Sequence, residues 1–67
     1  MKTMEYKGFT GSLNWAKGDR LYYGRVLGIK SLVGYEGETL ELVEEDFHDS
    51  LDMYLDYCTR EGLDPRV

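Results

Sequence analysis

The stretch TLELVEEDFHDSLDMYLDYCTREG, from Thr39 to Gly62, decides the fold because it has the pattern of one long amphipathic helix. At about 100° per residue, its apolar side chains gather in a stripe roughly 120° wide, opposite most of its acidic side chains. Thr39 is a good N-cap, and Gly62 followed by Pro65 is a typical end signal. We therefore predict a helix over Thr39–Glu61 that lies on a sheet. The apolar stripe consists of Leu40, Val43, Phe47, Leu51, Tyr54, Leu55 and Cys58.

Before this helix, period-two patterns separated by short polar connections predict three strands, over Met4–Trp15, Leu21–Ile29 and Ser31–Glu36. A single first strand would carry Phe9, Leu13 and Trp15 on one side and Met4, Tyr6 and Thr10 on the other. The polar connection Ala16–Arg20 has the length and glycine content of a hairpin loop, so antiparallel pairing is expected. The predicted fold class is α+β, a three-stranded antiparallel sheet packed by one long helix in the order β-β-β-α.

The second predicted strand is apolar on both faces, which is unusual for a sheet with one solvated side. Glycine inside a strand often marks a close approach of another backbone, so we place the face with Gly24 and Gly28 under the helix. Tyr22 and Val26 would pack there. The other face carries Leu21, Tyr23 and Leu27 and has no predicted cover. A chain this short buries only about 60% of its unfolded surface. We therefore expect a homodimer or higher homo-oligomer, formed through this face or the free edge of an outer strand.

The net charge of −5 conceals an uneven distribution along the chain. Residues 1–35 hold six basic and two acidic side chains, a balance of +4, whereas residues 36–67 hold two basic and eleven acidic ones, a balance of −9. An acidic chain is atypical of a dedicated nucleic-acid binder. The acidic helix side is either a solvated surface or a surface for a basic partner. The residues expected to meet such a partner are Glu45, Asp49, Asp52 and Asp56.

No set of residues in the sequence indicates an active site, so we expect no enzyme activity, cofactor or metal. Glu44, His48 and Asp52 lie on one ridge of the helix, but helical metal sites draw ligands from facing helices and only one helix is predicted. Cys58, the single cysteine, lies on the apolar stripe and is interpreted as a core residue. The first residues lack the apolar stretch of a signal peptide, and no apolar run approaches the ~18 residues of a membrane span. A cytoplasmic protein is expected.

Aromatic side chains beside basic ones on the sheet suggest an alternative function. Such an arrangement could stack the bases of single-stranded nucleic acid, although aromatic residues are also enriched at protein–protein interfaces. The aromatic residues are Phe9, Trp15, Tyr22, Tyr23 and Tyr35, and the basic ones are Lys7, Arg20 and Arg25.

Four segments together resemble the amino-terminal domain of HicB-family antitoxins. They are YKGFTGS at residues 6–12, LYYGRVLGI at residues 21–29, YEGET at residues 35–39 and DFHDSLDMYLDYC at residues 46–58. The resemblance covers essentially the whole chain and implies a partial RNase H-like fold without RNase H activity.

The resemblance also implies a function, because HicB-family antitoxins bind and neutralise HicA, a small basic mRNA-interfering toxin. We therefore expect residues 1–67 to form one HicB-like toxin-binding domain with a HicA-like toxin as its partner. Family members usually continue into a segment that binds operator DNA. This chain stops at Val67, so DNA binding is not expected of it.

Overall fold

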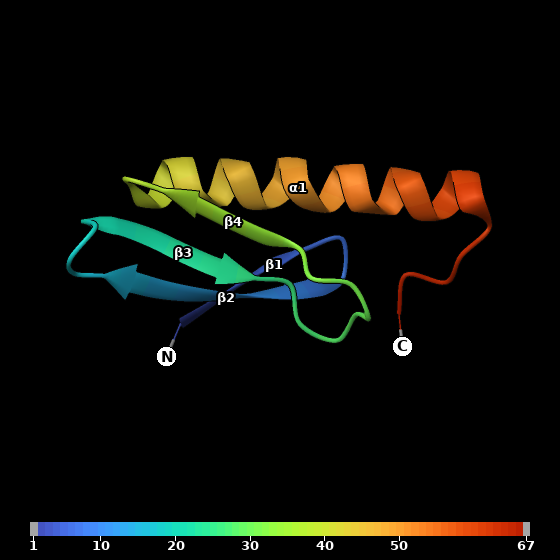
Figure 1. Ribbon diagram of the computed structural model, residues 1–67, viewed down its shortest axis with the longest axis horizontal. Coiled ribbons are helices and arrows are strands. Elements are labelled where there is room, and N and C mark those ends of the chain that lie inside the picture. Colours follow the sequence, from blue (N-terminus) through green and yellow to red (C-terminus); the bar gives the residue numbers. More distant parts are fainter. Residues whose placement is uncertain (1, 67) are drawn as a thin grey trace.

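Four antiparallel strands and one long helix make up the protein in the computed structural model, which describes residues 2–66 (Figure 1). The order in the sheet is β1-β2-β3-β4, and α1 lies along β4 over one face of the sheet. We call the other face of the sheet the open face. The elements are β1 (Lys2–Tyr6), β2 (Phe9–Ala16), β3 (Leu21–Arg25), β4 (Gly34–Gly37) and α1 (Leu40–Glu61). The α+β class is confirmed, but the sheet has four strands where three were predicted.

The predicted helix is confirmed together with both of its ends. The hydroxyl of Thr39 accepts a hydrogen bond from the N–H of Leu42 at 3.1 Å. Gly62 has a φ of 68°, and the N–H of Leu63 reaches the carbonyl of Cys58 at 2.8 Å, which forms a Schellman ending. Of the predicted apolar stripe, Leu40 is half exposed, because it lies in the first turn. The buried residues of α1 are Val43, Phe47, Leu51 and Cys58.

The first predicted strand is wrong because a tight turn divides it into β1 and β2. Lys7 and Gly8 both have positive φ, 52° and 81°, as the two central residues of a type I′ hairpin turn do. The hairpin pairs Tyr6 with Phe9 and Met4 with Gly11. Cross-strand partners point to the same face of a sheet, so Met4 and Tyr6 share a face with Phe9 rather than opposing it.

The second and third predicted strands are shorter in the structure. β3 ends at Arg25, followed by one isolated bridge between Val26 and Gly11, and residues 27–33 form a loop before β4. The predicted orientation of β3 is supported by burial. Val26 is buried in the core, whereas Tyr23 is 45% and Leu27 38% exposed.

A tyrosine hydroxyl lies between β2 and β3, where the backbone ladder of these two strands is interrupted. The hydroxyl of Tyr35 donates to the carbonyl of Ser12 at 2.7 Å and also lies 3.2 Å from the carbonyl of Arg25. The Ser12 hydroxyl accepts the N–H of Arg25 at 3.0 Å, in place of a backbone acceptor. Burial raises the pKa of Tyr35 to about 12, partly offset by its hydrogen bond to Ser12. Each polar group in this gap therefore has a partner.

Two glycines leave the room that the Tyr35 ring needs. A Cβ at Gly11 would collide with the Tyr35 hydroxyl and the Phe47 ring, and a Cβ at Gly24 would collide with the backbone of Ser12. The rings of Tyr35 and Phe47 lie 4.9 Å apart, which joins β4 and α1 over this gap. The core therefore depends on small residues in the middle of β2 and β3.

Tyr35→Phe is expected to lower the free energy of unfolding by about 1–3 kcal/mol, because the buried carbonyl of Ser12 loses its donor. Tyr23→Phe is the matched control: its hydroxyl makes no hydrogen bond within residues 2–66, so a change within about 0.5 kcal/mol is expected. Urea denaturation followed by circular dichroism measures both. Equal stability of the two variants would contradict the structure of this gap.

Gly24→Ala is expected to destabilise the fold by at least about 1 kcal/mol, because the new methyl group meets backbone atoms that cannot rotate away. At Gly18 no atom lies within 4 Å of an added Cβ, so Gly18→Ala should be neutral or mildly stabilising. Thermal melts of the two variants provide the comparison. A Gly24→Ala protein as stable as the Gly18→Ala protein would be inconsistent with the tight packing of β3 on β2.

Candidate functional site

Three of the four acidic residues predicted to meet a partner lie on the side of α1 that faces away from the sheet. Glu45, Asp49 and Asp56 are exposed there, and Asp56 pairs with Arg60 at 3.4 Å. Glu45 and Asp49 form no hydrogen bond or ion pair within residues 2–66. Asp52 differs from the other three, because the chain's own side chains already bind it.

Asp52 ties the β1–β2 turn to the middle of α1. Its Oδ1 lies 2.7 Å from Lys7 Nζ, and its Oδ2 accepts the Tyr6 hydroxyl at 3.0 Å. The Tyr6 ring also stacks on His48, with centroids 3.9 Å apart and planes 17° apart. Asp52 is therefore a structural contact between the hairpin and the helix, whereas its predicted contact with a partner stays a prediction.

The hydrogen bond to Lys7 holds the pKa of Asp52 below its usual range, and the bond to Asp52 raises the pKa of Lys7. Because the pKa of Asp52 is depressed in the folded state, its ionised carboxylate stabilises the fold above its ordinary pKa of 3.8. This stabilisation is lost as the pH falls through the folded-state pKa. The raised pKa of Lys7 has the opposite effect on the pH dependence of stability. Its charged ammonium group stabilises the fold below pH 10.5, and this stabilisation is lost as the pH rises through the folded-state pKa. Both side chains are substantially exposed, so water and salt screen the pair.

The ridge of Glu44, His48 and Asp52 is not assembled as a metal site. The His48 ring lies against Tyr6, and Asp52 is engaged with Lys7. Among residues 2–66, no group of three His, Cys, Asp or Glu side chains is arranged to hold a metal ion. Cys58 is buried, as its place on the apolar stripe predicted.

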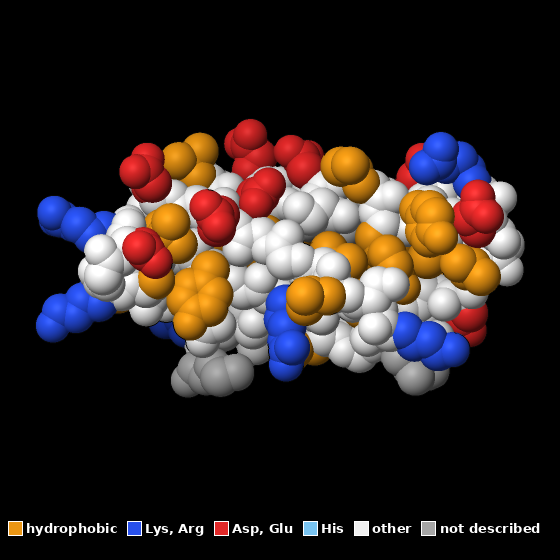
Figure 2. Space-filling view, viewed as in Figure 1, with side chains coloured by type: hydrophobic (Ala, Val, Ile, Leu, Met, Phe, Trp, Pro, Cys, Tyr) orange, Lys and Arg blue, Asp and Glu red, His pale blue; other side chains and the backbone are white. Residues whose placement is uncertain are grey.

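An acidic hollow of about 380 Å³ lies between β4 and the first half of α1. Asp46 fixes one wall, because its carboxylate accepts the N–H of Glu36 at 2.9 Å. Figure 2 shows acidic side chains gathered over this part of the molecule. The sequence reasoning found Glu45 and Asp49 but not the β4 side of the hollow, because helix periodicity alone does not show which strand lies beside the helix. The lining residues are Glu36, Gly37, Glu38, Leu42, Glu45, Asp46 and Asp49.

The predicted oligomer surface on the open face is only partly exposed. Leu21 is half-buried, and Tyr23 and Leu27 are the more exposed members of the set. A shallow hollow crosses the end of this face and is lined by Ala16, Asp19, Leu21, Tyr23 and Glu36. The open face therefore carries both charged and apolar side chains and is not continuously apolar.

The aromatic residues of the alternative hypothesis do not form one stacking platform. Phe9 and Tyr35 are buried in the core. Trp15 pairs with Tyr22 across β2 and β3, and their rings lie 4.7 Å apart. Tyr23, the next residue along β3, points to the opposite face, because side chains alternate along a strand. The exposed rings are therefore split between two faces of the sheet.

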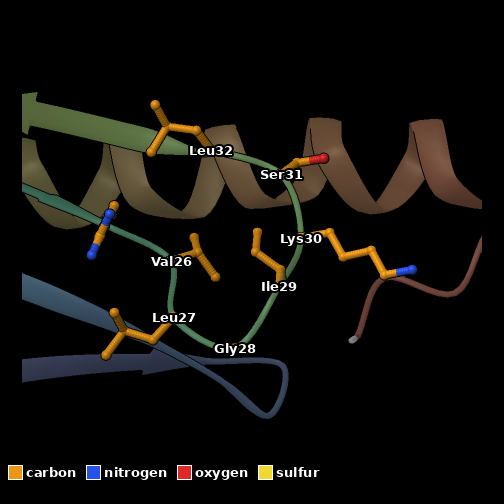
Figure 3. A pocket seen from close by; sticks show the side chains of 8 residues that line it. Val26, Leu27, Gly28, Ile29, Lys30, Ser31 and Leu32 are labelled. Carbon is orange, nitrogen blue, oxygen red and sulfur yellow. The ribbon is translucent and has the colours of Figure 1, made fainter.

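The loop after β3 encloses a hollow of about 350 Å³, lined by residues 25–32 (Figure 3). Figure 3 shows the side chains of Val26 and Ile29 directed into the loop, whereas Lys30 points away from it. Ile29 packs against the core, so apolar side chains line the inside of the loop.

Comparisons of the chain with protein-family models, with curated proteins and with solved structures found no significant match. Within residues 2–66, no helix combines the length and the apolar character needed to cross a bilayer.

Lys7→Met is expected to move the pKa of Asp52 up towards its ordinary value of 3.8, because the neighbouring ammonium group and its hydrogen bond are lost. Lys17→Met, a change in the exposed β2–β3 loop, should leave the pKa of Asp52 the same as in the unchanged protein. The carboxyl carbon shift of Asp52, followed by NMR against pH, measures this. An Asp52 titration that is the same in both variants would show that the pair does not persist in solution.

Proposed function

We propose that this chain is a non-enzymatic, antitoxin-type domain that binds and neutralises a small basic toxin of the HicA kind. Two independent features support the proposal. One is the resemblance of residues 6–12, 21–29, 35–39 and 46–58 to HicB-family antitoxins. The other is the acidic surface formed by the outward side of α1 and the hollow beside β4.

The observation that carries most weight is that Glu45 and Asp49 have no partner within residues 2–66 and share a hollow with Glu36 and Glu38. These four carboxylates line one hollow, so together they present negative charge to a cationic surface that approaches. The side chain of Leu42 is also exposed in the hollow, where the aliphatic stem of a lysine or arginine can rest. This combination fits a basic protein partner better than a nucleic acid.

Electrostatic attraction of this kind acts mainly on the rate of association and is screened by salt. We therefore expect the toxin to bind fastest at low ionic strength. Asp52 contributes less than Glu45 and Asp49, because Lys7 already neutralises it.

The test is co-expression with a HicA-like toxin, scored by growth rescue and co-purification. The double variant Glu45→Lys with Asp49→Lys should raise the dissociation constant at least tenfold. The matched control is Glu5→Lys with Asp19→Lys, which makes the same change in net charge at exposed positions away from α1. The control variant should bind as the unchanged protein does.

Failure of the unchanged protein both to associate and to rescue growth would reject the antitoxin function. A fluorescence-anisotropy titration with single-stranded oligouridylate at low salt examines the alternative function. Binding there that weakens steeply with salt would favour a nucleic-acid-binding module instead.

A further inference from the structure

The chain turns back after α1 and lies against the end of the molecule that holds the β1–β2 turn. Gly62, with its φ of 68°, ends the helix, and Figure 1 shows the following segment running from the end of α1 towards the level of the sheet. We call residues 63–66 the tail segment. They form no helix or strand, so side-chain contacts hold them in place.

Arg66 attaches the tail segment to the β1–β2 turn. Its Nη2 donates a hydrogen bond to the carbonyl of Gly8 at 2.8 Å, which joins segments 58 residues apart in the sequence. Its guanidinium carbon lies 4.0 Å from the centroid of the Phe9 ring, where the face of the ring attracts a cation. A Cβ at Gly8 would lie only 3.3 Å from Nη2, so the absence of a side chain there leaves room for the guanidinium group.

A second attachment joins the tail segment to α1. The hydroxyl of Tyr54 donates to the carbonyl of Pro65 at 3.2 Å, and the carboxylate of Asp64 accepts the N–H of Arg66 at 3.0 Å. The tail segment is nevertheless exposed, apart from Pro65, which is half-buried. Few attachments and high exposure are the marks of a segment that opens separately from the rest of a fold.

The tail segment helps to cover two buried side chains of the domain. Phe9 is 5% exposed and lies beneath the guanidinium group of Arg66. Cys58 is 3% exposed, although it does not belong to the core cluster around Phe47. It lines a hollow of about 380 Å³ together with Lys30 and Ser31 of the loop before β4 and Leu63, Asp64 and Arg66 of the tail segment. These two segments therefore shield Cys58 on this side.

We propose that the tail segment is a strap that closes this end of the molecule and opens as a unit while the sheet and α1 stay folded. Arg66 is its main attachment, and opening gives solvent access to Cys58 and Phe9. A partner that binds residues 63–66 in their open arrangement shifts this equilibrium towards the open state. The thiol of Cys58 reports the opening, and the proposal gives it no chemical role. The inference does not rest on the antitoxin function, because it uses only contacts within the chain.

Labelling of Cys58 in the full chain with the disulfide reagent dithiobis(nitrobenzoate) tests the proposal. When opening and closing are fast relative to labelling, the rate follows the population of the open state. The unchanged protein should label at least tenfold more slowly than the urea-unfolded chain, and Arg66→Ala should raise its rate at least fivefold. The matched control is Arg60→Ala, which removes the same kind of cation near Cys58 but breaks an ion pair with Asp56 instead. It should stay within twofold of the unchanged protein.

The urea dependence of the same rate separates opening of the strap from global unfolding. Opening a segment of this length exposes little surface, so the labelling rate below the unfolding transition should change little with urea. A rate that rises with urea in parallel with global unfolding at every concentration would overturn the proposal. So would equal rates for Arg66→Ala and Arg60→Ala, or an unchanged protein that labels as fast as the unfolded chain.

NMR of the unchanged protein gives a second measurement that needs no variant. Protons above the face of an aromatic ring are shielded, so the side-chain signals of Arg66 next to its guanidinium group should lie upfield of their random-coil positions. Signals at the random-coil positions would show that the closed strap is not the main state, and would overturn the proposal.

Discussion

The hydroxyl of Tyr35, buried in the gap between β2 and β3, is the contact on which the rest of the structure depends. It satisfies the carbonyl of Ser12 at the point where the ladder opens, while the Ser12 side chain satisfies the N–H of Arg25. A buried polar group without a partner costs more than a typical hydrogen bond contributes, so this gap is stable only when it is complete. The requirement explains why β2 and β3 contain glycine where the ring of Tyr35 passes.

The position of the Tyr35 ring in turn positions α1 and the surfaces it presents. Tyr35 packs on Phe47, which aligns α1 with β4 and turns Glu45 and Asp49 outward. The β1–β2 turn then reaches the helix through Lys7 and Asp52. As a consequence, the acids of α1 differ in their surroundings: Asp52 joins the hairpin to the helix, whereas Glu45 and Asp49 make no hydrogen bond or ion pair within residues 2–66.

The helix could be predicted because its stripe, N-cap and terminal glycine are all local signals, and Thr39 and Gly62 occupy the predicted caps. The division of the first strand could not, because Lys7 adopts a positive φ without the Asn-Gly or Asp-Gly pair that marks most such turns. The binding of Asp52 by Lys7 and Tyr6 and the acidic hollow beside β4 both depend on contacts between distant segments. The side-chain periodicity of a single helix contains no information about them.

The joint role of Tyr35 and Ser12 is tested most directly by a double-mutant cycle of Tyr35→Phe and Ser12→Ala, measured by urea denaturation. The two side chains hydrogen-bond to backbone groups in the same gap, so the losses in the free energy of unfolding from the two substitutions should not add. A coupling energy of about 0.5–3 kcal/mol is predicted. Losses that add to within about 0.3 kcal/mol would show that the two side chains act independently, and would contradict the role given to this gap.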